Sequence, residues 1–281
     1  MHAYYLTQWI LFFFIYSFIG WIWESCYVSV RKRRWVNRGF LHGPMLPIYG
    51  SGALVILIST IGVRENPWLI FLFGMLAATV LEYITGAVME KMFHVRYWDY
   101  SRQKLNLNGY ICVSSSLCWG VFSVLLVRAV HIPVERAVLD IPLFITDGAA
   151  LVLTVIMTVD LTQSFNEAMD LKQVLAQLEE SKEQIGEMQE KLLQLEELAE
   201  RIEVLLKEEI PSKAGSLISE EKREELKKFR NSIAGEFGRM SSRKDKIYLH
   251  IASQLKRNPT AASKKFAKAL EELKDTLENI K

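Results

Sequence analysis

Apolar residues dominate the first 162 positions of the chain and fall into five long runs. A bilayer core about 30 Å thick requires roughly 20 apolar residues in a helix that rises 1.5 Å per residue. The pattern therefore predicts an all-α polytopic membrane helix bundle over residues 1–162, with about five transmembrane helices, the second being the shortest. The runs are residues 4–30, 45–63, 68–89, 110–130 and 141–161.

The basic residues between these runs indicate how the helices are oriented. Five Lys and Arg residues follow the first run and four follow the third, whereas the other two connections have one each. Cytosolic loops of membrane proteins carry an excess of Lys and Arg. The bias predicts an N-terminus outside the cell and a C-terminus in the cytosol. The lipid bilayer is then the first partner of this multi-pass chain.

Beyond residue 162 the apolar pattern changes to a heptad repeat. Apolar residues recur every seven positions from Leu171 to Leu206, and the positions three later are apolar except for Ser181. This is the spacing of a coiled coil, and a seam of about 36 residues corresponds to a rod about 54 Å long. Residues 163–210 are predicted to form an acidic coiled coil through which the chain forms a homo-oligomer. A helix that packs on a later segment of the same chain is the alternative.

The formal charge of +2 conceals an acidic segment followed by a basic one. Residues 166–210 have 5 basic and 13 acidic side chains, and residues 211–281 have 17 and 10. Residues 211–281 are therefore predicted to be a basic helical tail, with helices from Glu220 to about Arg257 and from Thr260, as N-cap, to Ile280. Interspersed Glu residues dilute its charge, so no nucleic acid is expected among the partners.

The segment from Asn37 to Gly52 joins the first two apolar runs and fits neither a helix nor a loop. Its Gly and Pro residues disfavour a regular helix, and it is too apolar for a solvated loop. Non-helical backbone at membrane depth is stable only when protein buries it or when it lines a water-filled cavity. We therefore expect this segment, with Arg38, His42 and Tyr49, to be the functional centre.

Acidic residues inside the apolar runs are the clearest single-residue indications of a functional site or a buried ion pair. A charge in the bilayer core costs about 2.5 kcal/mol or more unless it is paired or hydrated. Glu82 lies near the middle of the third run. It fits either a proton, cation or substrate site that faces a cavity, or a buried structural partner of an Arg or of the Gly/Pro segment. For Glu24 and Glu90, near the interface, pairing with Arg38 or Arg96 is expected.

The loop from Arg96 to Ser101 is aromatic and charged, at the expected cytosolic boundary. Trp and Tyr form belts at headgroup depth, which would account for Trp98, whereas Asp99 and the polar residues after it favour a cap or gate. Both interpretations stay open. Ten side chains are thus candidates for a cavity or gate: Glu24, Asn37, Arg38, His42, Tyr49, Glu82, Glu90, Arg96, Trp98 and Asp99.

The sequence gives no support for soluble-enzyme chemistry. It contains no phosphate loop ending in Gly-Lys-Ser/Thr, no His-Glu-x-x-His and no Gly-x-Ser-x-Gly. Its three cysteines form no disulfide framework, and His42 and His94 lack a second His or a Cys with metal-ligand spacing. We expect no enzyme activity, no cofactor and no metal ion.

Several blocks between residues 9 and 160 resemble a known family. These blocks are Gly20-Trp21-Ile22-Trp23-Glu24, Asn37-Arg38-Gly39-Phe40-Leu41-His42-Gly43-Pro44, Pro47-Ile48-Tyr49-Gly50, Glu82-Tyr83 with Glu90, Trp98-Asp99-Tyr100-Ser101 and Asn108-Gly109. Together they resemble the bacterial membrane protein family labelled putative ABC-transporter permease, type IV. The resemblance implies a protein of the bacterial cytoplasmic (inner) membrane that works with a separate ATPase subunit, because this chain has no nucleotide-binding domain.

Three functions are compatible with these observations. The first is a permease-like transport component of unknown substrate. The second is a non-transporting membrane scaffold or sensor that oligomerises or recruits cytosolic partners through its coiled coil. The third, an intramembrane enzyme that acts on a lipid, is suggested only by carboxylates near an aromatic inner boundary.

Overall fold

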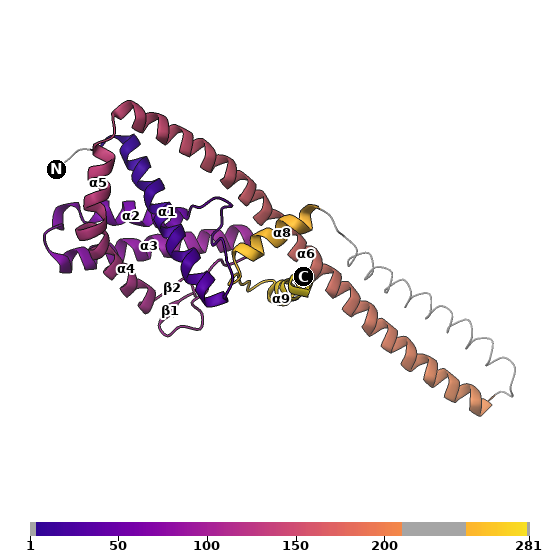
Figure 1. Ribbon diagram of the computed structural model, residues 1–281. Helices are drawn as coiled ribbons and strands as arrows, with labels where there is room; N and C mark the ends of the chain where they lie inside the picture. The colour runs from indigo at the N-terminus through magenta and orange to yellow at the C-terminus, as the bar shows by residue number, and fades with distance from the viewer. Residues whose placement is uncertain (1–3, 210–245, 280–281) are drawn as a thin grey trace. The chain divides into compact units, whose positions relative to one another are not determined.

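Four helices in the described part of the chain are long and apolar enough to cross a membrane. The computed structural model describes residues 4–209 and 246–279, and Figure 1 draws their helices and strands. Apart from one small hairpin, the regular structure of these residues is helical, as the apolar runs predict. The four stretches are α1 (Leu6–Lys32), α3 (Pro67–Phe93), the continuous stretch Val113–Leu139, and the first part of α6 (Leu143–Glu209).

The predicted second transmembrane helix is a short apolar helix instead. α2 (Pro47–Ser59) has 13 residues, and a 3-10 turn, η1 (Ile61–Val63), follows it. At 1.5 Å per residue α2 measures about 20 Å, which is less than the thickness of the bilayer core. The described residues therefore hold four helices of spanning length and one that is too short to span by itself.

α2 begins half-way along α1 rather than at its end. The Leu46 N–H donates a hydrogen bond to the Ser17 carbonyl (3.0 Å). A Cβ on Gly50 would lie only 2.2 Å from Ser17 Oγ and 2.5 Å from the Phe13 carbonyl, so glycine permits this close crossing. The non-helical segment 33–46 thus returns from the end of α1 to the middle of the bundle, where Pro47 opens α2 at a position that favours proline.

The stretch Val113–Leu139 contains a local change of helix type. It consists of α4 (Val113–Leu125), a π-helical turn η2 (Leu126–Val130) and α5 (His131–Leu139). Pro133 has no N–H to donate, and its ring crowds the preceding turn, which accounts for the departure from α-helical geometry there. His131, directly after the π turn, is turned into the core and is 2% exposed.

Contacts define two ends of the helix bundle. At the first, which we call the Tyr4 end, the hydroxyls of Tyr4 and Tyr16 lie 3.5 and 2.8 Å from the two ring nitrogens of His131. At the second, the basic end, α1 and α3 finish in left-handed residues, Arg33 and His94.

A β-hairpin connects α3 to α4 at the basic end. β1 (Asn106–Leu107) and β2 (Ile111–Cys112) pair in antiparallel fashion. Asn108 and Gly109 have φ of 54° and 78°, which is the geometry that an Asn-Gly turn adopts readily. The Tyr100 N–H donates to the Gly109 carbonyl (2.9 Å), so the hairpin holds the preceding loop in place.

The last part of the chain joins the membrane-spanning helices in one compact unit. Residues 1–172 and 250–281 form this unit, and residues 173–249 form a second. The C-terminal helices are α8 (Lys246–Arg257) and α9 (Ala267–Asn279). The predicted helix start at Thr260 is wrong: residues 260–266 form no α-helix, because Ala262 pairs through its backbone with Arg96.

The heptad segment is helical as far as α6 extends, to Glu209. The coiled coil and the homo-oligomer stay predictions. The predicted helix start at Glu220 lies outside the described residues.

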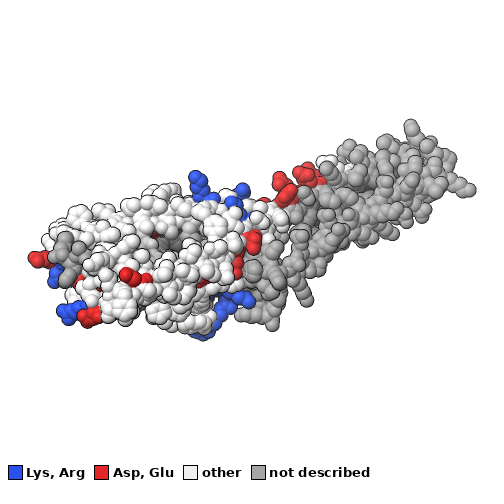
Figure 2. All heavy atoms as spheres, turned by 90° about the horizontal axis from the view of Figure 1, so that it is seen from above, with Lys and Arg blue, Asp and Glu red and all other residues white. Residues whose placement is uncertain are grey.

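The surface of the spanning helices is largely apolar. Large hydrophobic side chains are exposed on each of them, among them Trp23, Leu76, Val121 and Val155. Figure 2 shows a broad face of this part of the molecule with few charged side chains. Such a surface is expected of helices that contact lipid.

Candidate functional site

A cavity of about 580 Å³ lies inside the first unit, toward the basic end. Residues of α1, α2, α3, α4 and α6 line it, together with the segment 38–46, the loop 97–103 and Asn258. The lining is mostly apolar, and its charged side chains are Glu24, Arg38 and Glu82. Cavities of this volume and composition are typical binding sites for small organic molecules. Nine aromatic residues line it: Phe40, Tyr49, Phe93, Tyr97, Trp98, Tyr100, Trp119, Phe122 and Phe165.

Glu82 on α3 is held by uncharged donors. The Tyr100 hydroxyl donates to Oε1 (3.1 Å) and the Trp119 indole N–H donates to Oε2 (3.1 Å), with the Ser115 hydroxyl at 3.5 Å. The residue is 5% exposed, and none of the described Lys, Arg or His side chains forms an ion pair with it. Burial and the adjacent Glu82 carboxylate raise the pKa of Tyr100, so its hydroxyl remains a donor.

Glu24 on α1 faces the same cavity and is partly neutralised. The Tyr49 hydroxyl donates to its Oε1 (2.9 Å), and Arg38 Nε lies 3.9 Å from its Oε2. The expected pairing of Glu24 with Arg38 is thereby confirmed.

Arg38 also ties three separate segments together. Its Nη2 donates to the Tyr97 carbonyl (2.9 Å) and its Nη1 donates to Asn258 Oδ1 (2.7 Å). Its own backbone N–H donates to Ser25 Oγ on α1 (3.1 Å). The guanidinium therefore serves as a fixed link at the wall of the cavity, with most of its donors already used.

Three side chains of the loop from Arg96 to Ser101, including that of Tyr97, line the cavity, and that of Asp99 does not. Trp98 and Tyr100 line the cavity, whereas Asp99 turns back and accepts from Arg96 Nη1 (3.2 Å) and from the Ser101 N–H (2.9 Å). Burial alone would raise the pKa of Asp99, but the bonds from Ser101 and the charge of Arg96 outweigh it and lower the pKa.

Arg96 is the buried centre of this loop. Its Nε donates to Glu90 Oε2 on α3 (2.7 Å), which confirms the expected pairing, and its guanidinium lies 4.8 Å from the centre of the Tyr110 ring. Although burial disfavours its charge, the hydrogen bond that Arg96 donates to Glu90 and the negative charges of Glu90 and Asp99 raise the pKa of Arg96 overall. Its backbone exchanges two hydrogen bonds with Ala262, of 2.7 and 2.9 Å.

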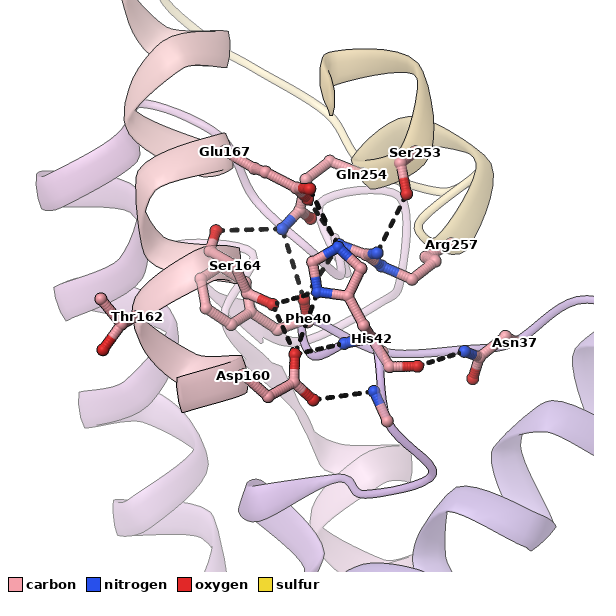
Figure 3. A network of polar contacts seen from close by, with 12 residues as sticks. Asn37, Phe40, His42, Asp160, Thr162, Ser164, Glu167, Ser253, Gln254 and Arg257 are labelled. Atoms are coloured by element: carbon pink, nitrogen blue, oxygen red, sulfur yellow. Dashed lines mark hydrogen bonds and ion pairs between the residues drawn. The ribbon is translucent and has the colours of Figure 1, made fainter. Parts of the chain in front are cut away.

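A polar network built on His42 fastens the Gly/Pro segment to α6, as Figure 3 shows. Asp160 accepts from the backbone N–H groups of His42 (2.9 Å) and Gly43 (2.7 Å). The His42 ring nitrogens lie 3.0 Å from Asp160 Oδ1 and 2.9 Å from Glu167 Oε1. Both nitrogens can donate to these carboxylates only when the ring is protonated. Protonated His42 would thus be held between two acidic groups of one helix.

The C-terminal segment, residues 254–258, completes this network. Arg257 on α8 donates to Glu167 Oε2 (2.9 Å), and the Asn258 amide donates to the Gly39 carbonyl (3.0 Å). Gln254 donates to the Ser164 carbonyl on α6 (3.1 Å). These three side chains are each at most 6% exposed. The end of α8 therefore packs against the same segment that forms one wall of the cavity.

The ten candidates from the sequence divide into two groups of five. Glu24, Arg38, Tyr49, Glu82 and Trp98 line the cavity. The others support its wall from behind: Asn37, for example, accepts from the Trp21 indole N–H (2.6 Å) and donates to the His42 carbonyl (2.6 Å). The supporting group is Asn37, His42, Glu90, Arg96 and Asp99.

Several residues of the site were not among the sequence candidates. Ser115 and Trp119 lie four positions apart, which places them on one face of α4, and this spacing could have marked them as partners of Glu82. Arg257 and Asn258 gave no such signal, because no sequence period links them to Arg38 or Glu167 more than 80 positions away.

Comparison with known proteins gives one match. The model of a family described as "Putative ABC-transporter type IV" matches residues 11–165, which is more than half of the chain and includes every element of the cavity except Asn258. No curated protein and no solved structure showed significant similarity to the chain.

Proposed function

We propose that this chain, which belongs to the putative ABC-transporter type IV family, is a permease-like subunit of a transport system in the bacterial cytoplasmic membrane. It is a multi-pass membrane protein with four helices of spanning length among its described residues. In this proposal α2 and the segment 33–46 together make a fifth crossing. The excess of Lys and Arg at the basic end then puts that end and the C-terminus in the cytosol.

The observation that carries the proposal is the cavity that reaches Glu82. An ionisable side chain within a spanning helix is retained where it has a role that an apolar residue cannot fill. Glu82 lies at the wall of a chamber large enough for an organic solute, rather than in a fully packed interior. A broken, non-helical segment beside such a chamber is also typical of transporters, in which irregular backbone forms part of the substrate site.

The energy source in this proposal is a separate ATPase. The chain has no phosphate-binding loop of its own. The cytosolic surface available to such a partner would be the basic end, where the loop 96–105 and residues 254–266 lie beside each other through the pairing of Arg96 with Ala262.

A flux measurement tests the transport function. The chain would be reconstituted in proteoliposomes with candidate ATPase partners, and uptake of candidate solutes would be compared for the native protein and Glu82→Gln. We expect the variant to lose at least about 90% of the flux, because loss of a charge contact of 1.5–3 kcal/mol corresponds to about tenfold or more.

Asp147→Asn is the matched control for this measurement. Asp147 is also a carboxylate in a spanning helix, but it is exposed and does not line the cavity. Equal flux in the native protein and in Glu82→Gln would remove Glu82 from the mechanism.

A scaffold or sensor is the second candidate, and the length of α6 favours it. This helix has 67 residues, or about 100 Å at 1.5 Å per residue, whereas a bilayer core requires about 30 Å. The excess length would present the heptad surface to other proteins. Replacing Leu192 and Leu195 by Asp should dissociate a coiled-coil oligomer; if this abolishes the cellular phenotype and leaves flux intact, the scaffold role is favoured.

A further inference from the structure

The charged side chains that line the cavity leave one negative charge without a cation. Glu24 and Arg38 face each other across 3.9 Å and compensate each other. Glu82 has only hydroxyl and indole donors, which stabilise an ionised carboxylate without cancelling its charge. A buried carboxylate in this state attracts a cation strongly, because the surrounding medium screens it poorly.

The partial charges of two helices act in the same region. α2 begins at Pro47 and α4 begins at Val113, and the first turns of both helices line the cavity. The positive ends of helix dipoles favour the ionised form of nearby carboxylates. They therefore help Glu82 to remain charged in an apolar setting, but each represents only about half a unit charge and cannot act as its counter-ion.

The rest of the lining indicates what kind of cation would fit. Rings of Tyr49, Tyr100, Trp119 and Phe122 border the cavity, and aromatic faces attract organic cations while their surfaces bury apolar groups. A bare metal ion would require several oxygen, nitrogen or thiolate ligands. No group of three or more His, Cys, Asp or Glu side chains that could hold a metal exists among the described residues.

Arg38, the single basic residue that lines the cavity, is poorly placed to bind an anionic solute. The donors of Arg38 are directed to the Tyr97 carbonyl, to Asn258 and to Thr260. An anionic solute would have to displace these contacts and would also approach two carboxylates. The charge distribution therefore excludes anions more strongly than neutral solutes.

We propose that the cavity binds a small organic cation, a protonated amine or quaternary ammonium with an apolar body, and that Glu82 is its counter-charge. This inference depends on the proposed transport function for its biological meaning, since it names the substrate class of that site. Glu24 and Arg38 remain paired at the wall, and Tyr100, Ser115 and Trp119 are positioning residues that fix the Glu82 carboxylate.

The test compares three compounds of similar size and different charge. The full chain in phosphatidylcholine nanodiscs would be titrated calorimetrically at pH 7 with phenethylamine, 2-phenylethanol and 3-phenylpropionate, and empty nanodiscs would give the background. We expect phenethylamine to bind at least about tenfold more tightly than the alcohol, and the carboxylate to bind most weakly.

Three variants decide whether Glu82 is responsible. Glu82→Gln should abolish the preference for the amine over the alcohol, whereas Glu82→Asp should keep it, because it preserves the charge. Asp147→Asn should bind as the native protein does. A folding defect in Glu82→Gln would appear as loss of alcohol binding as well. Glu82→Asp then carries the test, because moving the carboxylate back by one methylene should change the affinity for the amine but not the affinity for the alcohol.

The outcomes separate this proposal from the transport function. Equal affinity for amine and alcohol, no binding of any of the three compounds, or an amine preference that survives Glu82→Gln would overturn the cation site. Flux of a neutral or anionic solute would contradict the proposed cation site but would support the transport function. Conversely, amine binding that depends on Glu82, without flux in any reconstituted system, would support the proposed cation site and contradict the transport function.

Discussion

At the scale of single residues, Arg96 is the side chain on which the loop beside the cavity depends most. It is 3% exposed and is bonded to Glu90 and Asp99, while its backbone pairs with Ala262. Arg96→Gln should reduce the free energy of unfolding by about 2 kcal/mol or more, because two carboxylates lose their counter-charge in a largely desolvated site. The measurement is reversible unfolding in mixed micelles.

Arg31→Gln provides the matched comparison at this scale. Arg31 is exposed at the end of α1, and among the described residues its guanidinium donates only to the Tyr27 hydroxyl (3.0 Å). Its replacement should change the free energy of unfolding by less than about 0.5 kcal/mol. If both variants lost the same stability, the buried network around Arg96 would contribute no more than a surface contact.

At the scale of elements, the crossing of α1 and α2 fixes the depth at which α2 starts. A Cβ at position 50 would collide with Ser17 Oγ and with the Phe13 carbonyl, which cannot move away without disturbing α1. Gly50→Ala should therefore lower the stability by about 1–3 kcal/mol, the usual effect of overpacking. Gly148→Ala is the control, because nothing lies within 4 Å of a Cβ there, and it should be neutral or stabilising by up to about 1 kcal/mol. If both variants lost the same stability, the flexibility of the helix, and not the close crossing at Gly50, would account for the loss.

The positions of the long helices can be predicted from the sequence. Long apolar runs mark α1, α3 and α6 well, because burial in lipid requires nearly every residue to be apolar. The same reasoning overestimates α2, since the apolar residues 45–63 include a non-helical approach and a terminal turn whose composition is equally apolar. It also predicts a helix start at Thr260, where the backbone pairing of Ala262 with Arg96 overrides local propensity.

For the site, the sequence identifies residues whose burial in a membrane is energetically costly. It does not identify the residues that form hydrogen bonds with them. Glu82 stands out because a carboxylate is rare in a spanning helix. Its donors Tyr100 and Trp119 do not, since Tyr and Trp are common at membrane boundaries for other reasons. Contacts such as that of Arg38 with Asn258 depend on the tertiary fold alone.

At the scale of the whole molecule, the C-terminal segment and the Gly/Pro segment form one connected wall. Arg257 bonds to Glu167 on α6, and Asn258 bonds to Arg38 and to the Gly39 carbonyl. Because Asn258 itself lines the cavity, we expect these contacts to restrict access to it from the basic end. Loss of both should open the wall toward the basic end, and the thiol of Cys118, an exposed residue of α4 that lines the cavity, should then be reached more readily from water.

The double substitution Arg257→Ala with Asn258→Ala should therefore raise the labelling rate of Cys118 by a charged, water-soluble maleimide in nanodiscs. A rise of about tenfold or more is expected, since each broken bond to a charged group contributes about 1.5–3 kcal/mol. Cys26, which is also exposed, would be replaced by Ser beforehand, and Cys118→Ser would measure the residual labelling. Lys256→Ala, an exposed position on the same helix, should leave the rate unchanged. If the double variant and Lys256→Ala were labelled at the same rate, the C-terminal segment would not restrict access to the cavity, and its contacts with α6 and the Gly/Pro segment would serve stability alone.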